Sequence, residues 1–126
     1  MGIIAQRLKE LGEPRPRNVG FPLQVMKETD GIKGCFHATE RMGGIFIHTL
    51  QSIDYGGGRA ALVAICRLAD ELGCPVYLEP KPYRTLLHRT PRTPQELIAY
   101  YSSYGFVGDE VSMKRLPLTA PQERNL

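Results

Sequence analysis

Three consecutive glycines, Gly56 to Gly58, stand directly before an amphipathic helical pattern and could help to bind an anion. The first turn of a helix directs its N–H groups out of the helix end, where the helix dipole adds partial positive charge. Glycine lacks the Cβ atom that would keep a ligand away, and Arg59 adds a cation. The pattern favours a phosphate or pyrophosphate, although a glycine turn that only joins a strand to a helix looks the same.

Two nucleotide-binding motifs are excluded by the residues around these glycines. No Gly-Lys-Ser/Thr follows them, so they do not form a P-loop. A dinucleotide-binding fold places such a turn in its first strand–helix unit and continues with several more units, whereas only one further helix is expected here.

Three titratable side chains could transfer protons: His48 and Glu79 in strand patterns, and Tyr101 in a helical pattern. Histidine changes charge near neutral pH, and a general acid or base must come within hydrogen-bond reach of the reacting atoms. Structural interpretations remain open for two of them. His48 could be a solvent-facing or a satisfied core histidine, and Tyr101 could be a core aromatic on the inner stripe of its helix.

A metal site is not expected. Cys35, His37 and His48 could approach one another on adjacent strands, and three or four such ligands would bind zinc. No CxxC or HxxxH spacing supports this, however. Cys66 lies on the inner face of a predicted helix and is expected to be an inert core thiol.

Composition predicts one globular domain without a strong preference for nucleic acid. The chain has 126 residues, 42% of them hydrophobic and 23% charged, and a net charge of +3. That charge is far below that of a dedicated nucleic-acid binder, and the basic segment 81–92 offers only Tyr83 for base stacking. This segment is either a solvated loop or an attractor for an anionic group; its basic residues are Lys81, Arg84, His88, Arg89 and Arg92.

The cysteines and the hydrophobic runs favour a cytoplasmic protein. Three cysteines without CxxC spacing argue against a disulfide framework and fit a reducing compartment. No apolar run approaches the roughly 20 residues that a membrane-spanning helix needs. The amino-terminal residues also lack the apolar core of a signal peptide.

The first half of the chain predicts a helix followed by three antiparallel strands. Ile4, Leu8 and Leu11 have helical spacing, which predicts a helix over 3–11. Segment 13–22 contains three prolines and is expected to be a loop. The strands are expected at 23–28, 33–40 and 44–53, because these segments alternate or are rich in β-type residues.

The second half predicts a strand–helix–strand unit and a capped helix. The amphipathic helix after the glycines buries Leu62, Ile65, Cys66, Ala69 and Leu72, and Gly73 ends it. A strand over 75–80 follows and should lie parallel to strand 44–53. Thr93, Pro94 and Glu96 form a capping box for a helix to Ser103, which Gly105 ends. A last strand is expected in 109–118 and a frayed tail in 118–126. The fold class is therefore α/β, with a mixed central sheet flanked by helices.

This order of elements resembles the GNAT superfamily of acyl-CoA N-acyltransferases. The matching features are the glycines 56–58, the long helix to Gly73, the strand PVYLEP, the helix ELIAYYSSYGFV and the strand DEVSMKRLP. The resemblance covers about Ile45 to Pro117 and is greatest to compact members of the kind often encoded by phages. It implies a single GNAT-like domain over 1–126, acetyl-CoA as co-substrate and N-acetyltransferase activity on a primary amine.

The resemblance also implies how acetyl-CoA would bind. Gly56 and Gly58 match the glycine positions of the pyrophosphate loop, so backbone N–H groups of Gly57 to Ala60 would hold the pyrophosphate. Ile53 stands where the family has Arg or Gln, and Arg59 could supply the missing charge. The strand edge near His48 to Leu50 would pair with the pantetheine arm.

For catalysis, the resemblance implies that an amine attacks the thioester directly. Tyr101, in the pattern Tyr-x-x-x-Gly-Phe, would protonate the departing thiolate, and His48, Glu79 or water would accept the amine proton. The mismatch at Ile53 favours an alternative, a GNAT-fold binding or inhibitor module without catalysis. The acceptor could be a small molecule or a protein, no membrane partner is expected, and a homodimer is compatible with the family.

Overall fold

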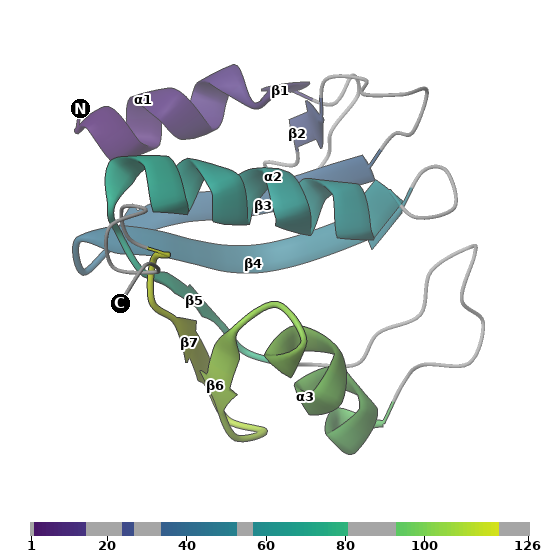
Figure 1. The fold of residues 1–126 in the computed structure, drawn as a ribbon. Coiled ribbons are helices and arrows are strands. Elements are labelled where there is room, and N and C mark those ends of the chain that lie inside the picture. Colours follow the sequence, from purple (N-terminus) through teal and green to yellow (C-terminus); the bar gives the residue numbers. More distant parts are fainter. Residues whose placement is uncertain (1, 15–23, 27–33, 53–56, 81–92, 119–126) are drawn as a thin grey trace.

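A computed structural model describes residues 2–14, 24–26, 34–52, 57–80 and 93–118 (Figure 1). The helices are α1 (Ile3–Glu10), α2 (Gly57–Leu72) and α3 (Pro94–Ser102). The strands are β1 (Gly12–Pro14), β2 (Gln24–Met26), β3 (Gly34–Arg41), β4 (Gly44–Ser52), β5 (Val76–Leu78), β6 (Phe106–Gly108) and β7 (Met113–Arg115). The expected loop 81–92, with its basic side chains, lies outside the described residues.

The described strands form one sheet of mixed direction in the order β1-β2-β3-β4-β5-β7-β6. β4 and β5 are parallel, and α2 connects them, as the strand–helix–strand pattern predicts. The other neighbouring pairs are antiparallel, including β2–β3 and β3–β4. The predicted fold class, an α/β fold with a mixed sheet flanked by helices, is confirmed.

Buried and exposed side chains alternate along the central strands, and this alternation decides which face of the sheet packs against α2. On β4, Ile45 and Ile47 are buried while His48 is exposed, and on β5 Val76 and Leu78 are buried. Adjacent residues of a strand point to opposite faces, so each strand contributes alternate side chains to the core. Four of the five expected inner residues of α2 are buried, and the fifth, Leu72, packs against the core while half-buried.

The expected loop at 13–22 is wrong at its beginning. Glu13 and Pro14 belong to β1, where they pair with Val25 and Gln24 of β2. Proline is tolerated on an edge strand because its missing N–H group need not face a partner. β1 is such an edge strand, which local proline content alone does not reveal.

The last strand expected in 109–118 is present as β7, but it is shorter than expected, and it forms a hairpin with β6, which was not predicted. Asp109 begins the turn between them. Its Oδ1 accepts hydrogen bonds from the N–H groups of Val111 and Ser112 at 2.9 and 3.1 Å. Gly108 has φ of 152°, and an added Cβ would contact the Ser112 carbonyl oxygen. The turn therefore requires the carboxylate of Asp109 as an acceptor and a residue without a Cβ atom at Gly108.

The capping box predicted for α3 is confirmed. Glu96 N–H donates to Thr93 Oγ1 at 3.1 Å, and Thr93 N–H donates to Glu96 Oε1 at 2.9 Å. We predict that Thr93→Ala lowers the free energy of unfolding by about 1 kcal/mol, because it removes one of these acceptors. Urea unfolding measures the change. Thr93→Ser is the control, since it keeps the hydroxyl, and equal losses in both variants would contradict this role.

Candidate functional site

The parallel pairing of β4 with β5 ends at the pair Ile47–Leu78. β5 ends at this pair, whereas β4 continues to Ser52, and Figure 1 shows the chain beyond β5 leading away from β4. His48 of β4 and Glu79, which directly follows β5, are the next residues after the last pair, and both are exposed. The two expected proton acceptors therefore come from β4 and from the residue after β5, at the point where the parallel pairing ends.

His48 occupies a β-bulge. Thr49 pairs with His37 and Ile47 pairs with Ala38, which leaves His48 as the additional residue on β4. Bulges redirect a side chain and are common beside functional sites. The bulge brings the His48 ring over the His37 ring, with 4.3 Å between centroids and 19° between planes.

Hydrogen bonding and charge favour a neutral His48. Its Nε2 lies 2.9 Å from Thr39 Oγ1, and its pKa is lowered, first by burial and then by the nearby charge of Arg41. The negative charge of Glu79 raises the pKa of His48, so the carboxylate is close enough to interact with the imidazole. When Nε2–H donates to Thr39, the Nδ1 lone pair is left to accept a proton.

The histidine pair predicts a dependence of stability on pH. The pKa of His37 is also lowered, first by burial and then by the charge of His48. Below about pH 6.5 the unfolded chain takes up protons that these folded histidines resist, so stability should fall as the pH decreases from there. Urea midpoints at pH 7.5 and 5.5 measure this loss. The loss of stability should be smaller in a variant carrying His37→Gln and His48→Gln. An equal loss in that variant would contradict the assignment of the pH dependence to these histidines.

The glycine segment differs from the expected turn because the helix begins within it. Gly57 is the first residue of α2, and Gly58 and Arg59 follow in its first turn. Gly58 is half-buried and Arg59 is exposed, whereas Ala60 packs against the core. The N–H groups of a helix's first turn are those of residues 57–60, the residues expected to face a pyrophosphate. Gly56 and Ile53 lie outside the described residues.

Tyr101 is half-buried and packs against the core from α3. Its ring lies edge-on to Phe106 of β6, with 5.8 Å between centroids, and edge-on to Tyr100 at 5.3 Å. Tyr101 thus lies on the inner side of α3, as expected. This position fits both interpretations of the residue, a core aromatic and a general acid. Leu50, expected to face the pantetheine arm, pairs with Phe36 of β3 and is half-buried against the core.

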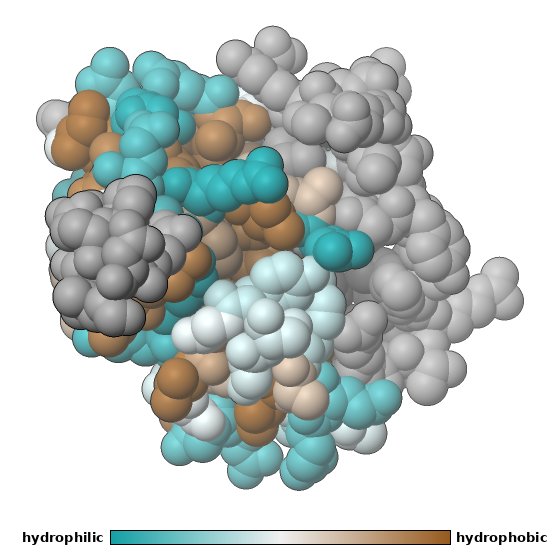
Figure 2. Space-filling view, in the orientation of Figure 1, coloured by the Kyte–Doolittle hydropathy of each residue, from teal (hydrophilic) through white to brown (hydrophobic). Residues whose placement is uncertain are grey.

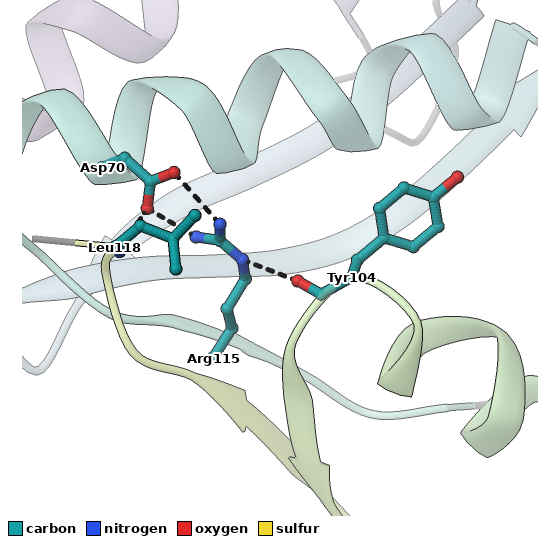
Figure 3. Close-up of polar contacts among 4 residues, drawn as sticks. All are labelled: Asp70, Tyr104, Arg115 and Leu118. Carbon is teal, nitrogen blue, oxygen red and sulfur yellow. Dashed lines mark hydrogen bonds and ion pairs between the residues drawn. The ribbon is translucent and has the colours of Figure 1, made fainter. Parts of the chain in front are cut away.

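Figure 2 shows hydrophobic surface between the hydrophilic side chains of α2 and the pale surface over the end of α3. Figure 3 shows the Tyr104 side chain extending from the end of α3 toward α2. The two helices that carry the glycine segment and Tyr101 thus lie on either side of this surface.

Sequence reasoning missed the ion pair between Asp70 of α2 and Arg115 of β7. Asp70 is not among the residues expected to face the core from its helix, and Arg115 has no predicted role. Arg115 is 6% exposed, and its Nη1 and Nη2 donate to the two carboxylate oxygens of Asp70 at 2.8 and 3.0 Å (Figure 3). One signal could have found it: Arg115 has the same strand parity as the apolar Met113, so both point inward.

The thiols do not form a reactive centre in the described part of the chain. Cys35, Cys66 and Cys74 are free and buried, and burial raises the pKa of Cys66 to about 11. Cys66 is therefore the protonated core thiol that the sequence predicts.

Among the described residues, no group of three histidine, cysteine or acidic side chains could hold a metal ion. None of the described helices is long and apolar enough to span a membrane.

No model of a known protein family matches this sequence, and no curated protein matches it. Among solved structures, the chain is similar to the crystal structure of the anti-CRISPR protein AcrVA5. The TM-score is 0.49 and the sequence identity is 19%, over 73% of this chain and 96% of that chain.

Proposed function

We propose that this protein is an acyl-CoA-dependent N-acetyltransferase of GNAT type, which transfers the acetyl group of acetyl-CoA to a primary amine. One observation carries the proposal. The parallel pairing of β4 with β5 ends at Ile47 and Leu78, and the next residue of the chain after each of them is a proton acceptor. α2 begins with Gly57 and Gly58 at the end of the sheet where β4 ends (Figure 1).

Binding of acetyl-CoA is assigned to the first turn of α2 and to the end of β4. The N–H groups of residues 57–60 and the helix dipole suit a pyrophosphate, and the exposed Arg59 adds positive charge. The pantetheine arm then runs beside β4 near His48 to Leu50. This arrangement would bring the thioester beside the part of β4 that extends beyond the end of β5, with α3 on the other side.

In the proposed reaction, the amine nitrogen attacks the thioester carbonyl carbon and forms the new C–N bond. His48 Nδ1, Glu79 or a water molecule accepts the amine proton. The C–S bond then breaks, and the Tyr101 hydroxyl donates its proton to the departing CoA thiolate. The hydrogen bond from Nε2–H to Thr39 would orient the imidazole for the first proton transfer.

The pH dependence of CoA release tests the role of His48. Acetyl-CoA is mixed with a panel of primary amines, including spermidine and lysine peptides, and the free thiol is measured from pH 5 to pH 9. Since the pKa of His48 is lowered, we predict an acid limb of kcat/KM with its midpoint below 6.5. His48→Gln should reduce turnover about tenfold and remove this limb, because Glu79 and water remain as weaker acceptors.

Two outcomes of this experiment would contradict the assignment. An acid limb that persists in His48→Gln would assign proton transfer to another group. Absence of thiol release with every amine would favour the alternative function, a GNAT-fold binding or inhibitor module. The presence of Ile53, where the family has a basic or amide side chain, is the observation that favours this alternative.

A further inference from the structure

Arg115 connects three separate elements through one side chain. It lies in β7, pairs with Asp70 in the last turns of α2, and donates from Nε to the Tyr104 carbonyl oxygen at 2.8 Å (Figure 3). The N–H group of Leu118 also donates to Asp70 Oδ1 at 2.7 Å. Leu118, the first residue of the expected tail, is therefore attached to α2, and 119–126 lie outside the described residues.

The guanidinium group is required for this geometry. Arginine offers donors in a fixed plane, so it can bind a carboxylate with two nitrogens and still use the third on a carbonyl oxygen. Lysine carries the same charge on one nitrogen and cannot reproduce all three bonds. Because Arg115 is buried, solvent screens its pair with Asp70 only weakly.

Two routes lead from Arg115 to Tyr101. The first is through the backbone, since the Tyr104 N–H donates to the Tyr101 carbonyl oxygen at 2.9 Å. The second is through the sheet, since Phe106 pairs with Arg115 and contacts the Tyr101 ring. The backbone and the ring of Tyr101 are thus both fixed by groups that Arg115 contacts directly.

We propose that the Asp70–Arg115 ion pair holds the end of α3 against α2 and so positions Tyr101 for protonation of the CoA thiolate. Arg115 is a positioning residue, and the inference rests on the acetyltransferase function proposed above. The pair lies near the carboxyl-terminal end of α2, whereas the glycines that suit the pyrophosphate begin the same helix. Loss of the pair should therefore affect proton transfer more than acetyl-CoA binding.

Arg115→Lys tests this positioning role, and Arg67→Lys is the matched control, because Arg67 is an exposed arginine on α2. We predict that Arg115→Lys lowers kcat for thiol release about tenfold and changes the acetyl-CoA affinity less than about twofold. The control should change neither quantity. A folded Arg115→Lys protein with unchanged kcat would overturn the proposal, as would parallel losses of affinity and kcat. If Arg115→Lys does not fold, Asp70→Asn removes the charge at nearly constant shape, and the same outcomes apply.

Hydrogen exchange separates this proposal from the proposed function, because it needs no activity. In Arg115→Lys, the amides of Tyr104 and Gly105 should exchange at least about tenfold faster than in the control, while those of Ile65 and Leu68 in α2 keep their rates. Acceleration of all four amides by the same factor would mean a global loss of stability and would overturn the positioning role. Wild-type protein that releases no CoA would refute the enzymatic function and leave the exchange result intact.

Discussion

Tyr101→Phe should lower the turnover of acetyl-CoA by about 100-fold or more, since a positioned general acid typically contributes a factor of that size. The change removes one hydroxyl group and leaves the ring, which lies edge-on to Phe106 and Tyr100. The core contacts of α3 should therefore persist. Acetyl-CoA affinity measured by calorimetry should stay within about twofold of wild type, because the lost interaction belongs to the transition state.

Tyr100→Phe is the matched control for this experiment. Tyr100 precedes Tyr101 on the same helix, is also half-buried, and packs against the core. Its substitution should leave turnover within about twofold, since no proton transfer is assigned to it. Equal turnover in the two variants would show that Tyr101 is a core aromatic without a catalytic role.

Phe36→Ala should lower the free energy of unfolding by about 3–5 kcal/mol, which is a large part of the stability of an ordinary domain. Phe36 is fully buried in β3, beneath the helices that cover this face of the sheet. Removing its ring leaves a cavity that rigid neighbours on β4 and α2 cannot fill. Urea unfolding at neutral pH measures the loss.

Phe46→Ala is the control for the opposite face of the same sheet. Phe46 is half-buried, and the Arg41 guanidinium carbon lies 4.8 Å from its ring centroid. Because the loss of stability follows the apolar area removed from water, this variant should lose less than half as much as Phe36→Ala. Comparable losses would contradict the assignment of the core to the face that carries Phe36.

Hydrophobic periodicity was sufficient to predict most of the fold. Ile4 and Leu8 indicated α1, and the segment from Thr93 to Ser103 indicated α3 with its capping box. The parallel direction of β4 and β5 followed from the short connections on either side of α2. These features depend on neighbouring residues, which is why local patterns identify them.

The errors lie where distant parts of the chain decide the structure. Pro14 joins a strand only because β2 lies beside it, and the β6–β7 turn depends on side-chain hydrogen bonds of Asp109. The Asp70–Arg115 pair joins residues 45 positions apart. The bulge at His48 likewise depends on pairing between strands, so the stacked histidines could be suspected from the sequence but not positioned.

Calorimetric titration of the wild-type protein with acetyl-CoA at moderate salt measures the binding on which the proposed function depends. We predict saturable binding of one acetyl-CoA per chain. Arg59→Ala should weaken this binding about tenfold or less, since one exposed charge beside a pyrophosphate contributes modestly. A titration that shows no binding at millimolar acetyl-CoA would contradict the proposed acetyl-CoA-dependent function.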